Sequence, residues 1–339
     1  MEGFNVAIAG ATGAVGEAML TILAERNFPV NKLFPLASER SAGSTIMFKG
    51  KAQKVGNLAE FDFTQAQIGL FSAGGSVSAE FAPKAAAAGC VVIDNTSCFR
   101  YDDDIPLVVP EVNPEKIAEY TNRNIIANPN CSTIQMLLAL KPIYDAVGIK
   151  RISVATYQAV SGTGKEAVKE LARQTADLLN GRDVQCKVYP KQIAFNALPH
   201  IDVFMDNGYT KEEMKMCWET CKILGDENIK VSATCVRVPV FYGHSEAVQV
   251  ETNGPITEEE VRRLLTAMPG VVVMDERKDG GYPTAVGDSV GQDAVFVGRI
   301  RQDISLTNGI NMWVVSDNLR KGAALNSIQI AEVLIKDLL

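Results

Sequence analysis

The feature that most constrains the fold is a glycine-rich turn behind the first apolar segment of the chain. Residues 4–9 form a short apolar strand, and Gly10-Ala-Thr-Gly13-Ala-Val-Gly16 leads from it into a segment with helical apolar spacing, 15–26. Glycines in such a turn let the backbone approach a pyrophosphate, and the next helix N-terminus offers N–H groups to that anion. The spacing is GxxGxxG rather than GxGxxG, but its strand–turn–helix context predicts a dinucleotide-binding unit.

The first 127 residues continue this alternation of strands and helices. Further strands are expected over 33–37, 68–72, 91–94 and 124–127, with an alanine-rich helix over 76–88. Alternation of this kind is typical of a parallel, doubly wound sheet with helices on both faces. The sequence therefore predicts an α/β protein whose first domain is a Rossmann-like parallel sheet.

After residue 132 the pattern changes. Helices are expected up to 147 and over 165–179, 210–224 and 257–268, and strands over 151–157, 231–240, 245–251, 271–275, 294–302 and 310–316. Longer strands with few crossover helices favour a mostly antiparallel sheet in an α+β domain. We expect a final helix over 319–338 to pack on the first domain. The predicted domains are 1–129 with the C-terminal segment 319–339, and 130–318.

The composition narrows the class of protein. With 339 residues, 47% hydrophobic and 22% charged, the chain fits a soluble globular protein of two domains. A net charge of −7 argues against nucleic acid and anionic membranes as partners. The N-terminus lacks signal-peptide features, no apolar run reaches about 18 residues, and seven cysteines without framework spacing indicate reduced thiols in the cytoplasm. Cys217 and Cys221 fit buried helix positions better than a metal site, so no metal is expected.

The end of the second strand decides between NAD and NADP. The ribose hydroxyls of NAD usually meet an acidic side chain there, whereas the 2′-phosphate of NADP meets an arginine. Arg40 and Ser38 suit the phosphate and favour NADP, while Glu39 leaves NAD as the alternative. A turn of small residues after the third strand lies at the same sheet edge and can face the nicotinamide half. The cofactor-binding residues predicted from these turns are Gly10, Thr12, Gly13, Ala14, Val15, Ser38, Arg40, Ser41 and Ser72.

Cys131 is the strongest candidate for a nucleophile. It lies in Asn-Pro-Asn-Cys-Ser-Thr (128–133), where it follows a strand and a proline and begins a helix. A helix N-terminus stabilises the thiolate, which is the reactive form of cysteine. A cysteine of the core would have apolar neighbours, and these neighbours are polar, so the segment favours covalent chemistry through a thioester.

The chain has two histidines, which limits the candidates for an acid–base partner of the thiol. His244 lies in the segment 237–246, Arg-Val-Pro-Val-Phe-Tyr-Gly-His-Ser-Glu, among residues that suit a site. Imidazole titrates near neutral pH and can therefore move a proton. His200 has apolar flanks and no nucleophile near it in sequence, so we interpret it as structural.

These segments together resemble the aspartate-β-semialdehyde dehydrogenase family, and the resemblance covers nearly the whole chain. The segments that carry it are 10–16, 95–100, 108–113, 128–135, 158–164, 237–246 and 317–321. The Asn-Pro-Asn-Cys segment and the Arg…Gly-His-Ser segment are the most specific of them. A helical run that ends at 181, followed by the irregular stretch 183–209, resembles the compact bacterial branch.

The resemblance implies a role for each matching residue of the reaction. Cys131 matches the nucleophile that forms an acyl-thioester, His244 matches the general acid/base, and Gln158 matches the residue that orients the acyl intermediate. Backbone N–H groups at the helix start, together with Asn130, are expected to stabilise the oxyanion.

The resemblance also implies the binding residues. Arg237 matches the arginine that clamps the substrate α-carboxylate, and a guanidinium fork suits that task. Glu212 matches the acid that faces the substrate amino group, although the adjacent Glu213 remains open for this role. The residues that match phosphate and substrate contacts are Arg100, Asn130 and Lys215, and those that match cofactor contacts are Ser161, Gly162 and Asn318.

The implied activity is that of an NADP-dependent, phosphate-dependent aspartate-semialdehyde dehydrogenase. It would reduce L-4-aspartyl phosphate to L-aspartate 4-semialdehyde in the biosynthesis of lysine, diaminopimelate, threonine, methionine and isoleucine. The resemblance further implies a homodimer formed by the second domain, which carries catalysis, while the first domain binds NADP.

Three other classes of protein fit the sequence less well. N-acetyl-γ-glutamyl-phosphate reductase performs analogous chemistry, but its nucleophile follows Asn-Pro-Gly, and Asn130 stands here. A glyceraldehyde-3-phosphate dehydrogenase would have two threonines after a Ser-Cys pair, and this sequence lacks that pattern. A non-catalytic cofactor-binding protein would be marked by loss of Cys131, Arg237 or His244, and all three are present.

Overall fold

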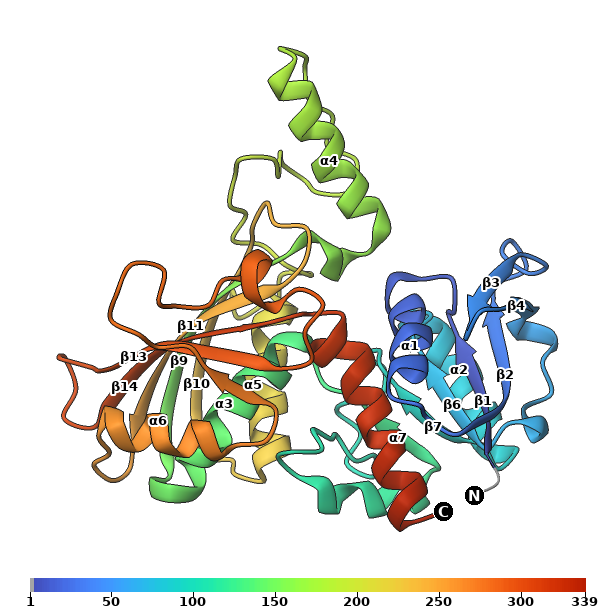
Figure 1. Ribbon diagram of the computed structural model, residues 1–339, viewed down its shortest axis with the longest axis horizontal. Coiled ribbons are helices and arrows are strands. Elements are labelled where there is room, and N and C mark those ends of the chain that lie inside the picture. Colours follow the sequence, from blue (N-terminus) through green and yellow to red (C-terminus); the bar gives the residue numbers. More distant parts are fainter. Residues whose placement is uncertain (1–2) are drawn as a thin grey trace. The chain divides into compact units, whose positions relative to one another are not determined.

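The computed structural model describes residues 3–339, which divide into two compact units (Figure 1). Unit 1 contains the described residues up to Pro129 together with Ala323–Leu339, and unit 2 contains Asn130–Gly322. Unit 1 is therefore built from both ends of the chain, whereas unit 2 is one continuous segment. No helix within residues 3–339 is both long enough and apolar enough to cross a membrane.

Unit 1 is built on a six-stranded parallel sheet with the order β5-β2-β1-β6-β7-β8. The strands are β1 (Phe4–Ala9), β2 (Val30–Ala37), β5 (Gly56–Asn57), β6 (Ile68–Phe71), β7 (Val91–Asp94) and β8 (Ile125–Ala127). The helices of this unit that follow β1 and β6 are α1 (Ala14–Glu25) and α2 (Gly75–Ala87). Because β1 lies between β2 and β6, the turns after these three strands share one edge of the sheet. The prediction of a Rossmann-like parallel sheet is confirmed.

Two connections in unit 1 differ from a regular strand–helix alternation. Between β2 and β6 the chain forms an antiparallel hairpin, β3 (Thr45–Phe48) and β4 (Lys51–Lys54), rather than a helix. Its turn residues Lys49 and Gly50 have φ values of 48° and 74°, as a two-residue hairpin turn requires. A 3₁₀ helix, η3 (Pro114–Asn122), leads into β8.

The C-terminal helix α7 (Leu325–Asp337) belongs to unit 1, where it contacts α1, η3 and β7. Arg26, the C-cap residue of α1, binds both carboxylate oxygens of Glu332 at 2.7 Å. Asn326, fully buried, donates from Nδ2 to the carbonyl oxygen of Val108 at 3.0 Å and to Oδ1 of Asn128 at 2.7 Å. A short π-helix, η6 (Arg320–Ala324), precedes α7.

Unit 2 contains a second six-stranded sheet with the order β10-β9-β11-β14-β13-β12. The strands are β9 (Ile149–Gln158), β10 (Lys230–Arg237), β11 (His244–Thr252), β12 (Val271–Val273), β13 (Val295–Gln302) and β14 (Gly309–Ser316). The three central pairs are antiparallel, and the two edge pairs, β9–β10 and β12–β13, are parallel. The sheet is therefore mixed. Long connections precede β10 and β13, and they allow each of these strands to run in the same direction as its neighbour, β9 or β12.

Helices cover one face of this second sheet. They are α3 (Cys131–Val147), α5 (Lys211–Leu224) and α6 (Glu258–Ala267), and each contacts strands of the sheet. Strand β11 shows the consequence, because His244, Glu246 and Val248 are buried. The intervening Ala247 and Gln249 point to the other face and are half-buried.

Helix α4 (Lys165–Leu179) projects away from the sheet of unit 2, with the irregular segment 183–209 beside it (Figure 1). Two buried side chains of α4 hold that segment. Glu170 accepts backbone N–H groups from three successive residues, and Gln174 accepts two more from residues 193 and 194. These bonds give an irregular segment its backbone partners, which the sequence pattern did not predict.

Candidate active site

Asn130 caps helix α3 at the residue before the candidate nucleophile. Its Oδ1 accepts the N–H groups of Ser132 at 3.0 Å and Thr133 at 3.4 Å, and the capping residue itself is extended, as N-caps are. Cys131 is therefore the first residue of the helix and is partly buried. The cap already binds these two N–H groups within the helix, and the expectation that the helix start and Asn130 stabilise an oxyanion stays a prediction.

Two carboxylates of α5 bind the remaining donors of Asn130. Glu219 Oε2 accepts its backbone N–H at 2.7 Å, and Glu212 Oε1 accepts its Nδ2 at 2.9 Å. Glu212 and Glu219 are seven residues apart, which places them two turns apart on one face of α5. Both are buried, so α5 delivers two acidic side chains to the start of α3.

Glu212 is the centre of a buried polar network. Besides Asn130, Gln158 Nε2 donates to its Oε1 at 3.0 Å and Lys215 Nζ donates to its Oε2 at 2.9 Å. Burial alone would raise the pKa of Glu212, but the Lys215 charge and the three side-chain hydrogen bonds lower it to about 2. Lys215 also binds Asp202 Oδ2 at 2.7 Å, a partner that sequence reasoning missed. Glu212 is therefore an anion at neutral pH.

Glu213, the alternative to Glu212, serves the fold. Its Oε2 accepts the backbone N–H of Thr210 at 2.7 Å, and Thr210 Oγ1 accepts the N–H of Glu213 in return, which forms a capping box. Its Oε1 accepts the N–H of Cys235 in β10 at 3.0 Å. The geometry therefore gives Glu213 a structural task and leaves Glu212 beside Asn130 and Gln158.

Gln158 and Arg237 face each other across the parallel pair β9–β10, at the ends of both strands. Thr156 Oγ1 donates to Gln158 Oε1 at 2.9 Å, which fixes the orientation of the amide. Arg237 is 5% exposed, and its Nη1 donates to the carbonyl oxygen of Ala159 at 2.7 Å. Its buried Nε has no hydrogen-bond partner among residues 3–339.

His244 begins β11 and is fully buried. Its Nδ1 accepts the backbone N–H of Ala159 at 3.0 Å, so the proton of the neutral imidazole lies on Nε2. Within the described part of the chain, this buried Nε2 has no partner. Burial first, and the Arg237 charge second, lower the pKa of His244 to about 3, while Glu212 opposes the shift. His244 is therefore neutral at physiological pH and presents an N–H donor.

Gly162 borders the space between these two donors. A Cβ at this position would lie 3.1 Å from Arg237 Nη1 and 3.5 Å from His244 Nε2. A side chain on residue 162 would therefore enter the space that both groups face. The other two unit 2 residues predicted to contact the cofactor bind each other, because Ser161 Oγ and the Asn318 amide are 3.0–3.2 Å apart. Asn318 Oδ1 also accepts the N–H of Gly243.

The predicted cofactor turn of unit 1 is a backbone cradle at the end of β1. Gly10 has φ +90°, and a Cβ there would lie 2.6 Å from the carbonyl oxygen of Ser72, in the turn after β6. A Cβ on Gly16 would lie 2.3 Å from the Gly10 carbonyl oxygen, so this glycine allows α1 to pack closely on the turn. Gly13 caps α1 without a side chain, which suits an incoming anion at the helix start.

The other predicted residues of unit 1 lie in the cradle, in the turn after β2 and, for Arg100, in the loop after β7. Those of the cradle are Thr12, Ala14 and Val15, and those of the turn after β2 are Ser38, Arg40 and Ser41. Arg40 is exposed, whereas Arg100 is 6% exposed and donates to the carbonyl oxygens of Asn128 at 2.9 Å and Asn95 at 3.1 Å. The turn after β2 thus offers an exposed cation, and Arg100 is held by the backbone of its own unit.

Glu246 is a buried titratable group that sequence reasoning did not single out. It is fully buried and shares the α3-facing side of β11 with His244. Burial raises the pKa of Glu246 well above its ordinary value of 4.5, and Gln135 and Ser132 of α3 offset only part of that shift. Burial therefore favours the neutral, protonated carboxyl. Strand alternation from His244 was the signal that could have placed it on the buried face.

The remaining sequence candidates have structural surroundings. His200 stacks on Phe204, with ring centroids 4.3 Å apart. The thiol of Cys217 lies 3.4 Å from two backbone carbonyl oxygens, and that of Cys221 lies 3.8 Å from another. Within residues 3–339, no group of three or more His, Cys, Asp or Glu side chains could hold a metal ion.

Comparison with known proteins covers both units. The family description "Semialdehyde dehydrogenase, NAD binding domain" matches residues 5–120, and "Semialdehyde dehydrogenase, dimerisation domain" matches residues 140–321. The aspartate-semialdehyde dehydrogenase of Shewanella violacea is 66% identical over 334 residues, which are 98% of each chain. That of Aquifex aeolicus is 57% identical over 337 residues, which are 99% of each. The NAD binding domain match indicates a nicotinamide cofactor.

Solved structures agree with these relatives. The crystal structure of aspartate semialdehyde dehydrogenase II from Vibrio cholerae, complexed with ASA, has a TM-score of 0.98 and 63% identity, and all of both chains is covered. The aspartate semialdehyde dehydrogenase of Candida albicans, crystallised with NADP, has a TM-score of 0.77 and 26% identity over 98% of each chain.

We expect Glu246→Gln to change how the stability of unit 2 depends on pH. The folded state keeps this carboxyl neutral while the unfolded chain ionises it, so its stabilising contribution is complete below pH 4.5 and is lost as pH rises. Relative to the variant, the wild type should lose up to about 1.4 kcal/mol of unfolding free energy for each pH unit above 4.5, until the folded carboxyl ionises.

Urea unfolding at several pH values between 5 and 8 tests this expectation, with tryptophan fluorescence as the signal. Both tryptophans, Trp218 and Trp313, lie in unit 2 and report on it. The exposed Glu259→Gln on α6 is the control and should show no such trend. A constant difference between wild type and Glu246→Gln across this range would contradict a neutral buried carboxyl.

Proposed function

Because the chain belongs to the aspartate-semialdehyde dehydrogenase family, we propose that it converts L-4-aspartyl phosphate into L-aspartate 4-semialdehyde with NADPH and releases phosphate. One observation carries this proposal: the buried Nε2–H of His244 and Nε–H of Arg237 have no partner within residues 3–339. A buried donor without an acceptor costs about 1–3 kcal/mol, so a ligand oxygen is expected to complete each of them. The acyl oxygen and the α-carboxylate of the substrate would do so.

The substrate carries three charged groups, and unit 2 offers a counterpart to each. Arg237 supplies the guanidinium for the α-carboxylate. Glu212 is an anion, and its two oxygens retain lone-pair capacity for the substrate ammonium beyond the three side chains they already bind. Lys215, the cation bound to Glu212, suits the substrate phosphate. Arg100 is a second predicted phosphate contact.

The proposed reaction begins at Cys131. Its thiolate, at the N-terminus of α3, attacks the acyl carbon of aspartyl phosphate, the carbon–oxygen bond to phosphate breaks, and phosphate leaves with the electron pair. The product on the enzyme is an acyl-thioester. Gln158, whose amide is fixed by Thr156 and Glu212, is placed to orient that acyl group.

His244 would act on the acyl oxygen as a hydrogen-bond donor. Its Nδ1 already accepts from Ala159, so the neutral ring has only the Nε2–H to offer, and full proton transfer from it would leave an imidazolate. Negative charge on the acyl oxygen would be stabilised by this donor in a buried site. Once a hydride has been added to the thioester carbon, collapse of the resulting oxyanion re-forms the carbonyl as an aldehyde, expels the Cys131 thiolate and needs no net proton. This role is narrower than the acid–base role that the resemblance implies.

The cradle of unit 1 fits a dinucleotide. Its glycines leave the space that a Cβ would fill, and α1 begins without a side-chain cap, so its N–H groups suit a pyrophosphate. A nicotinamide nucleotide in its reduced form supplies a hydride when bound. Arg40, beside Ser38 and Ser41, would bind the 2′-phosphate of NADP, which makes NADP rather than NAD the proposed cofactor.

The proposed enzyme would work in the cytoplasm. All seven cysteines lie in the described part of the chain, and each carries a free thiol, which suits a reducing compartment. Its semialdehyde product would supply the biosynthesis of lysine, diaminopimelate, threonine, methionine and isoleucine.

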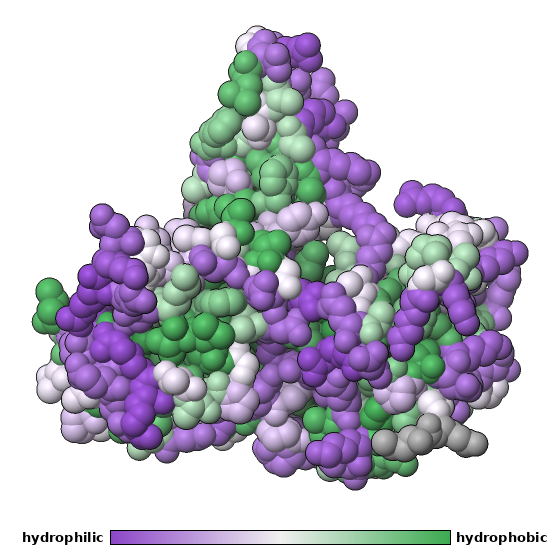
Figure 2. Space-filling model, viewed as in Figure 1, coloured by the Kyte–Doolittle hydropathy of each residue, from purple (hydrophilic) through white to green (hydrophobic). Residues whose placement is uncertain are grey.

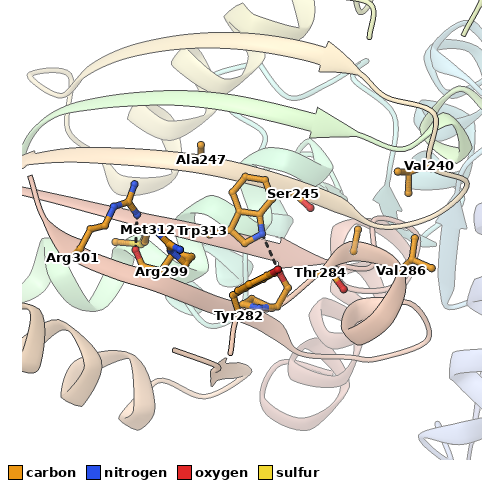
Figure 3. A pocket seen from close by; sticks show the side chains of 12 residues that line it. Val240, Ser245, Ala247, Tyr282, Thr284, Val286, Arg299, Arg301, Met312 and Trp313 are labelled. Atoms are coloured by element: carbon orange, nitrogen blue, oxygen red, sulfur yellow. Dashed lines mark hydrogen bonds between the residues drawn. The ribbon is translucent and has the colours of Figure 1, made fainter. Parts of the chain in front are cut away.

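We further propose that unit 2 forms a homodimer through the face of its sheet that the helices leave open. Tyr157 and Trp313 pack on this face with ring centroids 5.4 Å apart, and Trp313 donates to the carbonyl oxygen of Pro283. Beside them lies a pocket of about 560 Å³ lined by Ala247, Tyr282 and other largely apolar side chains (Figure 3). The projection that contains α4 also bears apolar residues along one side (Figure 2). Apolar surface of this kind is typical of interfaces.

Loss of the nucleophile should abolish the reaction. We expect Cys131→Ala to lower phosphate-dependent reduction of NADP by L-aspartate-β-semialdehyde by about 10⁴-fold or more, because no other group can form the thioester. The exposed Cys186→Ala should retain full activity. Absence of turnover in folded wild-type protein would overturn the proposal, and turnover of N-acetylglutamate semialdehyde instead would assign the related reductase activity.

Cofactor preference should depend on Arg40. We expect Arg40→Ala to raise KM for NADP about 10- to 100-fold, as loss of a charged hydrogen bond does, with little change for NAD. Glu39→Ala, one residue away, is the matched control and should leave the KM for NADP unchanged. If Glu39→Ala instead impairs turnover with NAD, and NAD is the better substrate of the wild type, the NAD alternative is correct.

The dimer can be tested by mass in solution. Wild-type protein should sediment at twice the chain mass of 36.6 kDa. Ala247→Arg places a charge on the open sheet face, and we expect it to shift the protein towards the monomer. Ala87→Arg, at an exposed position of α2, should leave the mass unchanged. A monomeric wild type, or a dimer unaffected by Ala247→Arg, would show that this face is not the interface.

A further inference from the structure

The residue before the nucleophile is held at each of its backbone and side-chain polar groups. The N–H of Asn130 binds Glu219, its Nδ2 binds Glu212, its Oδ1 caps α3, and its carbonyl oxygen accepts the N–H of Ile134 at 2.9 Å. Of these partners, Glu212 belongs to the substrate network and Ile134 to the helix itself. Glu219 belongs to neither, and at this point it binds the backbone N–H of Asn130.

The bond from Asn130 to Glu219 is the shortest of the four. Glu219 is 0% exposed, and its Oε2 lies 2.7 Å from the backbone nitrogen of Asn130. It comes from α5, the helix that also carries Glu212 and Lys215 at i−7 and i−4 on the same face. The helix that organises the substrate network therefore also holds the backbone that leads into Cys131.

We propose that Glu219 is a positioning residue for the nucleophile. By accepting the N–H of Asn130, it fixes the peptide that joins Asn130 to the preceding proline, and thereby the direction in which Cys131 leaves the N-terminus of α3. Its kinetic test depends on the proposed function, whereas the reactivity of the thiol can be measured without any substrate.

The two obvious variants separate position from charge. Glu219→Gln keeps an oxygen that can accept the N–H of Asn130, although the bond is weaker without the charge. Glu219→Ala removes the carboxylate that accepts the buried N–H of Asn130. A misplacement of about 1 Å at a reacting group can cost about 100-fold in rate. Loss of the acceptor should therefore lower the rate of the chemical step and leave substrate binding nearly unchanged.

We expect Glu219→Ala to lower kcat for the semialdehyde reaction about 10- to 100-fold with little change in KM, and Glu219→Gln to restore most of that loss. The rate at which iodoacetamide alkylates Cys131, followed from pH 5 to 9 in the absence of substrate, should change with Ala and return towards wild type with Gln. Labelling of Cys131 is read by peptide mass, which separates it from the other thiols.

The matched control is Ile223→Ala, a buried residue of α5 that the Asn130 contacts do not include. It should destabilise the helix similarly but leave kcat per folded molecule and the alkylation profile unchanged. An equal effect of Ile223→Ala, or no rescue by Glu219→Gln, overturns the positioning role. If Glu219→Ala does not fold, Glu219→Met keeps the volume without the acceptor and takes its place. If Cys131 of the wild type is alkylated but the protein turns over no semialdehyde, the proposed function is wrong. The alkylation rates of the variants then decide whether Glu219 positions Cys131.

Discussion

The buried ion pair of Glu212 and Lys215 is the interaction on which the rest of the unit 2 site depends. Removing a carboxylate from water is costly, and the lysine together with amide donors from Asn130 and Gln158 makes an ionised Glu212 stable there. The same contacts join the start of α3, the end of β9 and the face of α5. One buried charge therefore fixes the relative positions of three elements that supply the candidate nucleophile and its neighbours.

Burial has the opposite effect on two other groups of the same unit. His244 and Glu246 lie on one face of β11, and for both the cost of burying a charge outweighs the effect of their neighbours. His244 is therefore neutral near pH 7, and burial favours the protonated form of Glu246. An ionised acid beside a cation, a neutral imidazole with a single N–H and a neutral carboxyl thus coexist in one region. The charge state of each group in this region depends on its burial and on its charged or hydrogen-bonded neighbours, and not on its residue type alone.

The sequence predicted the parts of this structure that depend on local chemistry. The glycine turn after β1, the start of α3 at Cys131 and the bounds of α4 follow from spacing, capping and periodicity, and the structure has them. The hairpin at Lys49, the parallel edges of the second sheet, and the tasks of Asp202, Glu219 and Glu246 were missed. Each of these depends on contacts between residues far apart in the chain, and a single glutamate in a helix or strand looks the same in sequence whether it faces water or a buried N–H group.

Unit 1 closes only when the last residues of the chain return to it. Helix α7 packs on α1 with Leu325, Ile328 and Leu334 buried in the same cluster as the first strands. During synthesis on the ribosome, all of unit 2 is made before α7. The first domain to begin is therefore the last to be completed, and nascent unit 1 keeps an apolar surface uncovered until residues 323–339 reach it.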